Sequence, residues 1–363
     1  MKRSKHGSYQ KVVALVLIAI VIISAVGFVA NGWQPIINSG ADSDNAEGNN
    51  GDVANKNEGE DETPVIVEPK YYSYLTGLET TEEISRQVPI AFVTDPSQPL
   101  YGASSSSIAI EFPTEDASRL VLYSENATSL GKIGPIIPTR DYVSALLSHF
   151  GGTVFAMGND DIVDYVAKEF SGSLIDLSKI SGFHYTEVKN AFTNGDLVRA
   201  AILSSGSSTE LGNTVRLPFS FIDTDLERLN FTQEARKITI PYAEGKITEL
   251  TYDNEIGGYV YCKNGMQKND MLTASKISFN NAFILFSDSV THETSDGSEL
   301  VLKTTGSGSG YYMTDGTYKS IKWICDGDSL TLYDEKDNKL TINRGTSYIA
   351  FVKSTAKNLV IFS

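Results

Sequence analysis

The sequence predicts an α+β protein in which an N-terminal mixed α/β domain (residues 71–215) precedes an all-β C-terminal domain (residues 216–363), both carried on a single transmembrane helix. Three observations predict this order. An uncharged apolar run fills residues 12–30, and short apolar strands alternate with helical spacings between residues 71 and 209. Beyond about residue 215 the helical spacing nearly disappears.

The apolar run predicts a membrane anchor. As a helix, residues 12–30 would span roughly 28 Å, close to the hydrocarbon thickness of a bilayer. Residues 1–11 carry four lysines or arginines and no acidic residue, and the first charge after the run is Asp42. This asymmetry predicts a cytoplasmic basic tail (1–11), a signal-anchor (12–30) and an extracellular location for the bulk of the chain. Small residues at 25–27 leave a cleaved signal peptide open as the alternative.

Residues 31–70 are predicted to form a disordered acidic linker. Between residues 41 and 62 there are eight acidic residues and one lysine, with almost nothing apolar. Such a segment cannot bury enough surface to offset the entropy lost on ordering. We therefore expect a flexible, self-repelling tether between the membrane and the folded part.

The first half of the folded part mixes strands and helices. Residues 80–83 have the spacing of a capping box and predict a short helix that ends before Pro89. Apolar residues at helical spacing predict two longer helices, over 141–150 and 160–170. Strands are predicted at 89–94, 107–112 and 119–123.

The second half reads as an all-β domain of sandwich or rolled-sheet type. Turn signals separate short strands predicted at 237–242, 247–252, 259–263, 277–286, 300–304, 321–325, 330–333, 340–342 and 348–352. The glycine-rich segment Gly306–Gly310 lies between strands and opens no helix, so a β-bulge or tight turn is favoured over a phosphate cradle.

Composition and motifs narrow the function classes. The formal net charge of −15 argues against a nucleic-acid partner. There is no G-x-S-x-G, H-E-x-x-H, C-x-x-C or P-loop sequence, and no cofactor or metal site is predicted. The two cysteines, Cys262 and Cys325, fit either one disulfide or two buried thiols, and both interpretations stay open.

The densest group of charged residues lies in the first half and supplies the candidate ligand-binding residues. Two interpretations are open: a buried ion-pair network, or a guanidinium fork for a phosphate or carboxylate ligand. Arg140 at a predicted helix start favours an anion shared with the helix N-terminus, whereas His149 at the helix end also fits a cation that contacts the last carbonyls. The candidates are Glu111, Glu115, Arg119, Arg140, Asp141 and His149.

Several segments resemble a known family. The sequence I-G-P-I-I-P-T-R-D-Y at Ile133–Tyr142 is similar to the family's I-G-P-I-R-S-A-R-D-Y. Other similar segments in the first half are Leu75–Leu78, Gln87–Val93, Gly102 with Ser107–Glu111, Glu115 with Arg119, and His149–Thr153. Those in the second half are Leu250–Asp253, Tyr259, Asp270, Asn281, Gly306–Gly310, Asp315–Gly316, Trp323 and Arg344–Tyr348. The chain thus resembles the YerB-like putative lipoproteins of Gram-positive bacteria, a family of unknown function.

The chain also departs from this family's pattern. Ile137 stands where the family carries the first arginine of R-S-A-R, and Ala200–Ser205 stands where its P-H-N segment is expected. The predicted anchor is a transmembrane helix where relatives often carry a lipid. These departures imply a divergent member that has lost polar residues.

Three functional hypotheses follow. The first is a non-catalytic module of the cell envelope that binds a cell-wall ligand or an envelope protein. The second is an enzyme acting on a phosphate-bearing or other anionic wall intermediate, with Arg119 and Arg140 as the anion fork and Glu111 or Asp141 as base or metal ligand. The third is a purely structural interaction domain that uses exposed sheet edges. Carboxylates and arginines in an open cleft would favour a site, whereas closed pairs would favour architecture.

Overall fold

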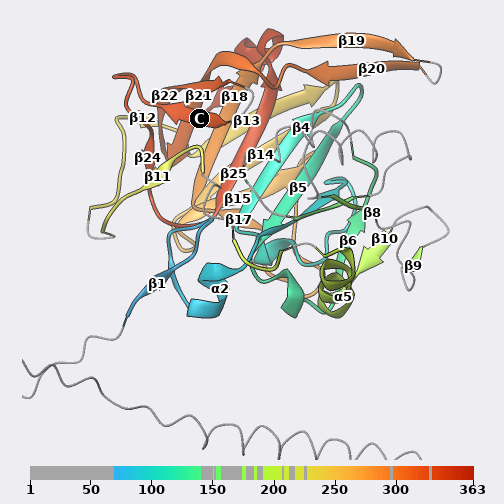
Figure 1. Ribbon diagram of the computed structural model, residues 1–363. Coiled ribbons are helices and arrows are strands. Elements are labelled where there is room, and N and C mark those ends of the chain that lie inside the picture. Colours follow the sequence, from blue (N-terminus) through green and yellow to red (C-terminus); the bar gives the residue numbers. More distant parts are fainter. Residues whose placement is uncertain are drawn as a thin grey trace, which may run out of the picture. The chain divides into compact units, whose positions relative to one another are not determined.

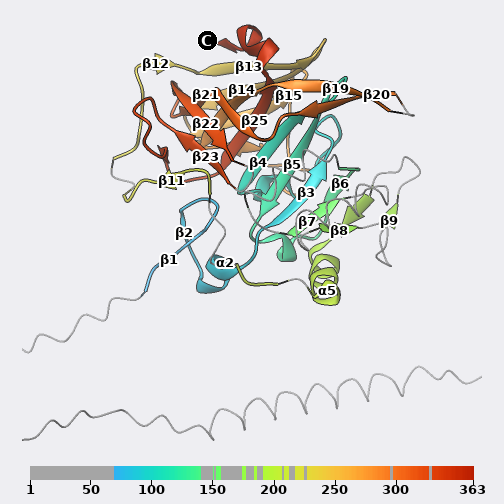
Figure 2. The same cartoon turned by 45° about the horizontal axis from the view of Figure 1, so that its top comes forward.

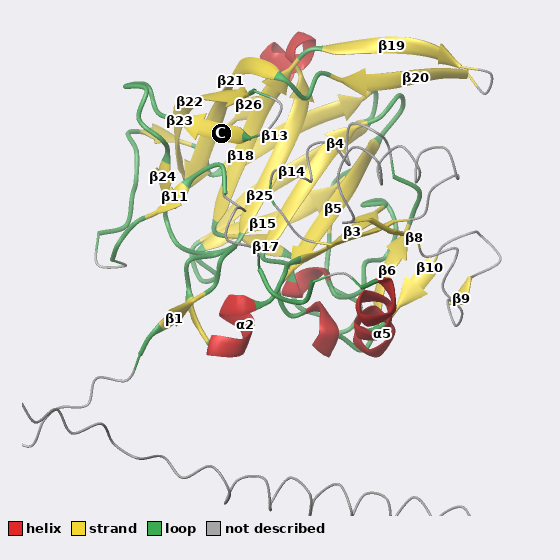
Figure 3. Ribbon diagram, in the orientation of Figure 1, coloured by secondary structure: helices red, strands yellow, loops and turns green. Residues whose placement is uncertain are grey.

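The computed structural model describes residues 69–139, 150, 153–156, 174–176, 184–185, 191–206, 208–211, 217–224, 227–294, 297–326 and 329–363. This part of the chain is mostly β, with two short α-helices (Figure 3). None of its helices is long and apolar enough to cross a membrane. The predicted anchor at 12–30 and nearly all of the predicted linker lie outside the described residues.

A large sheet forms the framework (Figure 1). Its strands follow the order β12-β22-β21-β18-β25-β4-β5-β3-β6-β10-β9, with β23 paired to β22 and with β7 joining β3 to β8. In chain order they are β3 (Ile90–Thr94), β4 (Ile108–Pro113), β5 (Ser118–Ser124), β6 (Ile133–Ile136), β7 (Thr153–Ala156), β8 (Leu174–Asp176), β9 (His184–Tyr185), β10 (Ala191–Thr193), β12 (Gln233–Glu234), β18 (Asn281–Ser287), β21 (Gly306–Thr314), β22 (Thr317–Cys325), β23 (Leu330–Tyr333) and β25 (Ser347–Lys353).

A second sheet of six strands has the order β16-β15-β14-β13-β26, with β17 paired to β15. Its strands are β13 (Lys237–Ala243), β14 (Lys246–Asp253), β15 (Gly258–Lys263), β16 (Met266–Gln267), β17 (Ser278–Phe279) and β26 (Ile361–Phe362). Three two-stranded pairs complete the strands: β1 (Tyr71–Tyr72) with β2 (Glu79–Thr80), β11 (Ser220–Phe221) with β24 (Thr341–Ile342), and the ribbon of β19 (Ser289–Thr294) and β20 (Gly297–Leu302). The α-helices are α2 (Glu82–Arg86) and α5 (Gly195–Ser205), and the 3-10 turns are η1 (Ala103–Ser105), η2 (Ala127–Ser129) and η4 (Ser354–Leu359).

The large sheet continues across the domain boundary predicted at residue 215. Strand β25, near the end of the chain, pairs in parallel with both β18 and β4, so the two predicted halves share one sheet. By internal contacts, residues 67–363 form one compact unit. The sequence could not show this because the pairing joins strands that lie far apart in the chain.

Apolar side chains cover both faces of the large sheet. On one face, residues of β4, β5, β18 and β25 pack against β13, β14 and β15 of the second sheet (Figure 2). On the other face, a separate core contains Phe219, Leu332 and Leu340 together with residues of the same central strands. Helix α5 and η2 cover a smaller core on β3 and β6. The first of these cores encloses the charged pair described below.

The local sequence signals were largely accurate. Helix α2 ends before Pro89 as predicted, but it begins after Thr81, whose hydroxyl accepts a hydrogen bond from the Ile84 amide, one residue later than the capping box at 80–83 predicts. Strands β3, β4 and β5 lie within a residue of their predicted limits. The helices predicted at 141–150 and 160–170 fall largely or wholly outside the described residues, so they stay predictions.

Two features differ from expectation, and a third decides between interpretations that were left open. The segment Gly306–Gly310 is the regular start of β21, paired on one or both sides, and not a bulge or turn. Helix α5, capped by the Asn194 side chain, was not predicted. Cys262 and Cys325 are both free thiols on strands of different sheets, so the structure contains two thiols and not the disulfide.

Candidate functional site

A buried ion pair joins the two sheets. Glu111 on β4 of the large sheet lies 2.6 Å from the ammonium of Lys263 on β15, measured from Oε1 to Nζ. Their side chains are 0 % and 3 % exposed. Both residues occupy inward positions of their strands, between the apolar side chains of the shared core. A charge this deep is tolerated only when it is paired and hydrogen-bonded.

The Lys263 ammonium and the Glu111 carboxylate have hydrogen-bond partners at all their donor and acceptor sites. The Lys263 ammonium donates to Glu111, to Ser118 Oγ at 2.7 Å and to Thr248 Oγ1 at 3.0 Å, which accounts for its three hydrogens. Glu111 also accepts hydrogen bonds from the hydroxyls of Ser118, Thr248, Tyr261 and Tyr348. A carboxylate with all its acceptor sites occupied is poorly suited to act as a general base.

The protonation states match this arrangement. Burial alone would raise the pKa of Glu111, but the Lys263 charge and the hydrogen bonds from Lys263, Ser118 and Tyr348 hold that pKa below its ordinary value. Burial, and then the negative charge of Glu111, raises the pKa of Tyr261 and Tyr348 well above the ordinary value. The two phenols therefore stay protonated and donate to the carboxylate.

A polar pocket of about 220 Å³ opens above this pair. Its lining comes from the segment after β3, the β4–β5 hairpin and the strand ends at β14 and β15. Lys263 and Ser118 belong to the lining, so the buried pair supports the base of the pocket. The other lining residues are Asp95, Pro96, Ser97, Thr114, Glu115, Asp116, Ala117, Arg119, Ile137, Lys246 and Asn264.

The structure divides the predicted site residues. Glu111 is closed to solvent and paired with a lysine, whereas Glu115 and Arg119 line the open pocket. Glu115 Oε1 accepts a hydrogen bond from the Leu300 amide at 2.7 Å, which ties the β19–β20 ribbon to the hairpin. Arg119 donates to the Pro138 carbonyl at 2.7 Å. Arg140, Asp141 and His149 lie outside the described residues.

Two lining residues add to what the sequence indicated. Lys263 was not predicted, although a lysine two positions after Tyr261 on an alternating strand would lie on the buried face, and this pattern could have identified it. Ile137, where the similar family carries an arginine, lines the same pocket. The departure noted in the sequence therefore removes a charge from this site.

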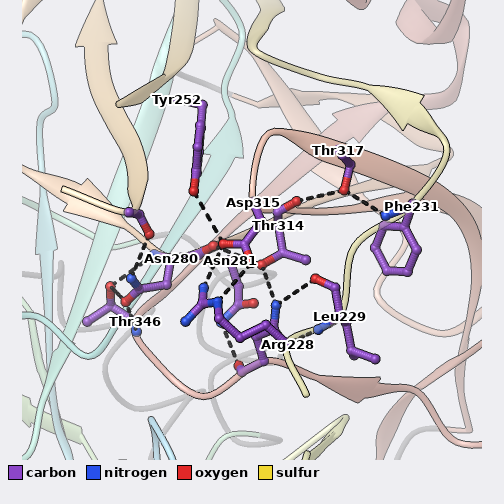
Figure 4. A network of polar contacts seen from close by, with 12 residues as sticks. Arg228, Leu229, Phe231, Tyr252, Asn280, Asn281, Thr314, Asp315, Thr317 and Thr346 are labelled. Atoms are coloured by element: carbon purple, nitrogen blue, oxygen red, sulfur yellow. Dashed lines mark hydrogen bonds and ion pairs between the residues drawn. The ribbon is translucent and has the colours of Figure 1, made fainter. Parts of the chain in front are cut away.

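A second network of buried polar groups, drawn in Figure 4, lies outside the pocket. Its centre is Asn343, which is fully buried. The Asn343 side chain accepts from the Leu229 amide at 2.7 Å and donates to the Leu229 carbonyl and to Thr314 Oγ1. Its backbone carbonyl accepts from the Asn281 side chain, whose own oxygen accepts from Tyr312. This network fastens the segment before β12 to the large sheet.

An exposed ion pair supports the same segment. Arg228 donates to Asp315 through Nε at 2.8 Å and through Nη2 at 2.6 Å, and the Tyr252 hydroxyl also donates to Asp315 (Figure 4). Asn281, Asp315 and Tyr252 all belong to segments that resemble the family. In this chain those residues hold the architecture together.

Asp270 also connects the two halves of the chain. It accepts hydrogen bonds from the Gly102 amide, the Leu272 amide and both the amide and hydroxyl of Ser104. Burial would raise the pKa of Asp270, but these backbone and hydroxyl donors lower it. Gly102 and Asp270, which resemble the family in separate segments, thus contact each other directly.

Glu125 is a buried carboxylate of a different kind. It accepts from Ser73, Leu75 and Ser107, and no lysine or arginine among the described residues pairs with it. Burial raises its pKa above the ordinary value, against the opposing effect of these hydrogen bonds. Protonation of Glu125 therefore favours the folded state.

We expect the Glu125→Gln variant to change how stability depends on pH. The pKa of Glu125 is higher in the folded state than in the unfolded state. The protonated side chain therefore stabilises the folded state fully at pH values below the unfolded-state pKa, and this stabilisation is lost as pH rises through the folded-state pKa. Urea unfolding of wild type and variant between pH 4 and pH 7.5 should show wild type losing stability relative to the variant as pH rises. The loss should be about 1.4 kcal/mol for each unit by which the pKa is raised. If the difference in the free energy of unfolding between wild type and variant stayed constant, or moved in favour of wild type as pH rises, the prediction would be contradicted.

The comparisons with known proteins agree with the fold. Residues 238–349 match a family described as the C-terminal domain of a protein of unknown function (DUF3048). The crystal structure of the YerB protein from Bacillus subtilis is similar with a TM-score of 0.67 and 19 % sequence identity, over 81 % of this chain and all of that chain. A search of curated proteins finds no significant match. Neither similarity names an activity. The resemblance seen in the sequence is confirmed: the chain carries a DUF3048 C-terminal domain and shares the fold of Bacillus subtilis YerB.

Proposed function

We propose that this chain is a membrane-anchored extracytoplasmic protein that binds a cell-wall ligand, without catalysis, in the pocket above Glu111 and Lys263. One observation carries the proposal: the charged groups best placed for chemistry are saturated by one another, while the pocket beside them stays open. The apolar run and the charge asymmetry at residues 1–30 support the location.

The lining indicates the character of the ligand. Asp95, Glu115 and Asp116 line the same pocket as Arg119 and Lys246, so the lining contains both acidic and basic groups. A ligand with amines as well as carboxylates, such as a peptide-bearing wall fragment, matches such a lining. The enzyme hypothesis loses Glu111 as a base, since its acceptor sites are occupied.

Thermal unfolding of the full-length chain in detergent micelles tests the proposal. Peptide-bearing wall fragments at about 100 times the dissociation constant should stabilise the protein by roughly 2.7 kcal/mol. The Lys246→Gln variant should lose this shift, because it removes an exposed cation from the pocket without touching the buried pair. The matched control is Lys322→Gln on β22, an exposed lysine paired with Asp337, which should keep the shift. No shift in wild type, or an equal shift in Lys246→Gln, would contradict the proposal.

A further inference from the structure

A second and larger pocket, of about 390 Å³, shares no lining residue with the first. It lies where β18 ends and β21 begins. Its walls are Ser287 and Asp288 after β18, Lys303 after β20, the strand segment Gly306–Ser309, and Ser354 with Lys357 on η4. Four parts of the chain therefore meet at one hollow.

Hydrogen bonds hold these walls in place. The buried Ser287 hydroxyl donates to the Lys303 carbonyl at 2.6 Å, and the Lys303 amide donates to the Asp288 carbonyl at 2.9 Å. The Ser354 hydroxyl donates to Asp288 Oδ1 at 2.6 Å. The pocket is thus formed without a ligand, which lowers the entropy lost when one binds.

Part of the pocket lining is backbone because Gly308 has no side chain. A Cβ on Gly308 would lie 2.4 Å from both the Phe286 carbonyl oxygen and Trp323 Nε1. The indole N–H of Trp323 donates to that same carbonyl at 2.9 Å. No side chain fits at Gly308, so backbone lines the pocket at this position. Its neighbours Ser307 and Ser309 on β21 also belong to the lining.

The rim is cationic, although the whole chain has a formal charge of −15. Lys357 donates to Ser309 Oγ at 2.8 Å, which leaves the Ser309 hydroxyl hydrogen for another acceptor. Lys303 lies 3.8 Å from Asp288, and both side chains are more than half exposed, so this pair is weak. Asp288 itself already accepts from Ser354. The pocket therefore offers two ammonium groups against one carboxylate.

We propose that this pocket binds a phosphate group. Two lysines and two serine hydroxyls of the lining supply donors from several directions. A phosphate has enough oxygens for all of them, and lysine binds it as a point charge. The phosphate could belong to a free anion or to a phosphodiester, and both sources share this chemistry. The inference does not depend on the ligand proposed for the first pocket.

Isothermal titration calorimetry on the full-length chain in detergent micelles tests the proposal. The probes are inorganic phosphate and glycerophosphoglycerol, a soluble phosphodiester, both at low ionic strength. The Lys303→Gln/Lys357→Gln double variant should bind at least one probe about tenfold or more weakly than wild type, as expected for losing charge-assisted hydrogen bonds. Whichever probe binds more tightly to wild type identifies the source of the phosphate.

Lys246→Gln serves as the matched control, since it changes a lysine of the first pocket. It should bind both probes with wild-type affinity. If the double variant unfolds, the single variant Lys357→Gln replaces it. We expect this variant to bind the phosphate probe several-fold more weakly than wild type. Failure of wild type to bind either probe, unchanged affinity in the lysine variants, or an equal loss in Lys246→Gln would each overturn the proposal. Since Lys246→Gln reports on the first pocket alone, the two proposals fail separately.

Discussion

Replacing Lys263 with methionine is expected to lower the free energy of unfolding by about 3–5 kcal/mol at pH 7, because it leaves the Glu111 carboxylate buried without its cation. Methionine keeps most of the lysine stem, so packing changes little. Urea unfolding of the full-length chain measures the loss. The loss should shrink at pH 4, because the carboxyl group deprived of Lys263 can then be buried in its neutral form.

The matched control uses a second pair on the same sheet. Lys237 on β13 lies 2.6 Å from Glu249, the same distance as in the buried pair, but its side chain is 48 % exposed. Lys237→Met should therefore cost at most about 1 kcal/mol. The two variants differ mainly in burial. Equal losses in both would show that burial of the Glu111–Lys263 pair has no energetic consequence.

Asn343→Ala is expected to cost about 3 kcal/mol. The substitution leaves the Leu229 amide and carbonyl without their partner, and it removes one partner of the Thr314 hydroxyl, which still donates to the Asn280 carbonyl. Buried polar groups that lose their partners cost about 1–3 kcal/mol each, although water entering the space can offset part of this. Urea unfolding measures the total, and amide hydrogen exchange at Leu229 shows whether the attached segment is released.

Arg228→Ala is the comparison for this variant. It removes the exposed ion pair with Asp315 that supports the same segment, and a loss of at most about 1 kcal/mol is expected. If Arg228→Ala were the more damaging change, the segment would be held by its surface charges and not by the buried amide.

Local structure was readable from the sequence because its signals are local. The short helix before Pro89, the apolar run of β3 and most strands beyond residue 237 follow from neighbouring residues alone. Helix α5 was not predicted, although Val198, Ala201 and Ile202 on its buried face have helical spacing. The Asn194 cap would have been the signal.

The site was only partly readable because its residues meet through non-local pairing. Glu111 was chosen as a candidate, but its partner Lys263 comes from a strand of the other sheet, and no sequence spacing connects the two. Glu115 and Arg119 were selected for their charge and do lie at one pocket. Their neighbours Lys246 and Asn264 could be found only after the β14–β15 hairpin was placed against the β4–β5 hairpin.

The position of β25 between β4 and β18 has a consequence for how the protein is made. On one side, the main-chain groups of β4 pair with residues 347–350, which are synthesised long after β4 itself. Until then, both β4 and β18 keep an open edge that can pair with other chains. A shortened chain ending before β25 would expose both edges at once. The central sheet therefore cannot close before β25 has been made, and aggregation is avoided only if both edges are kept from pairing with other chains until then.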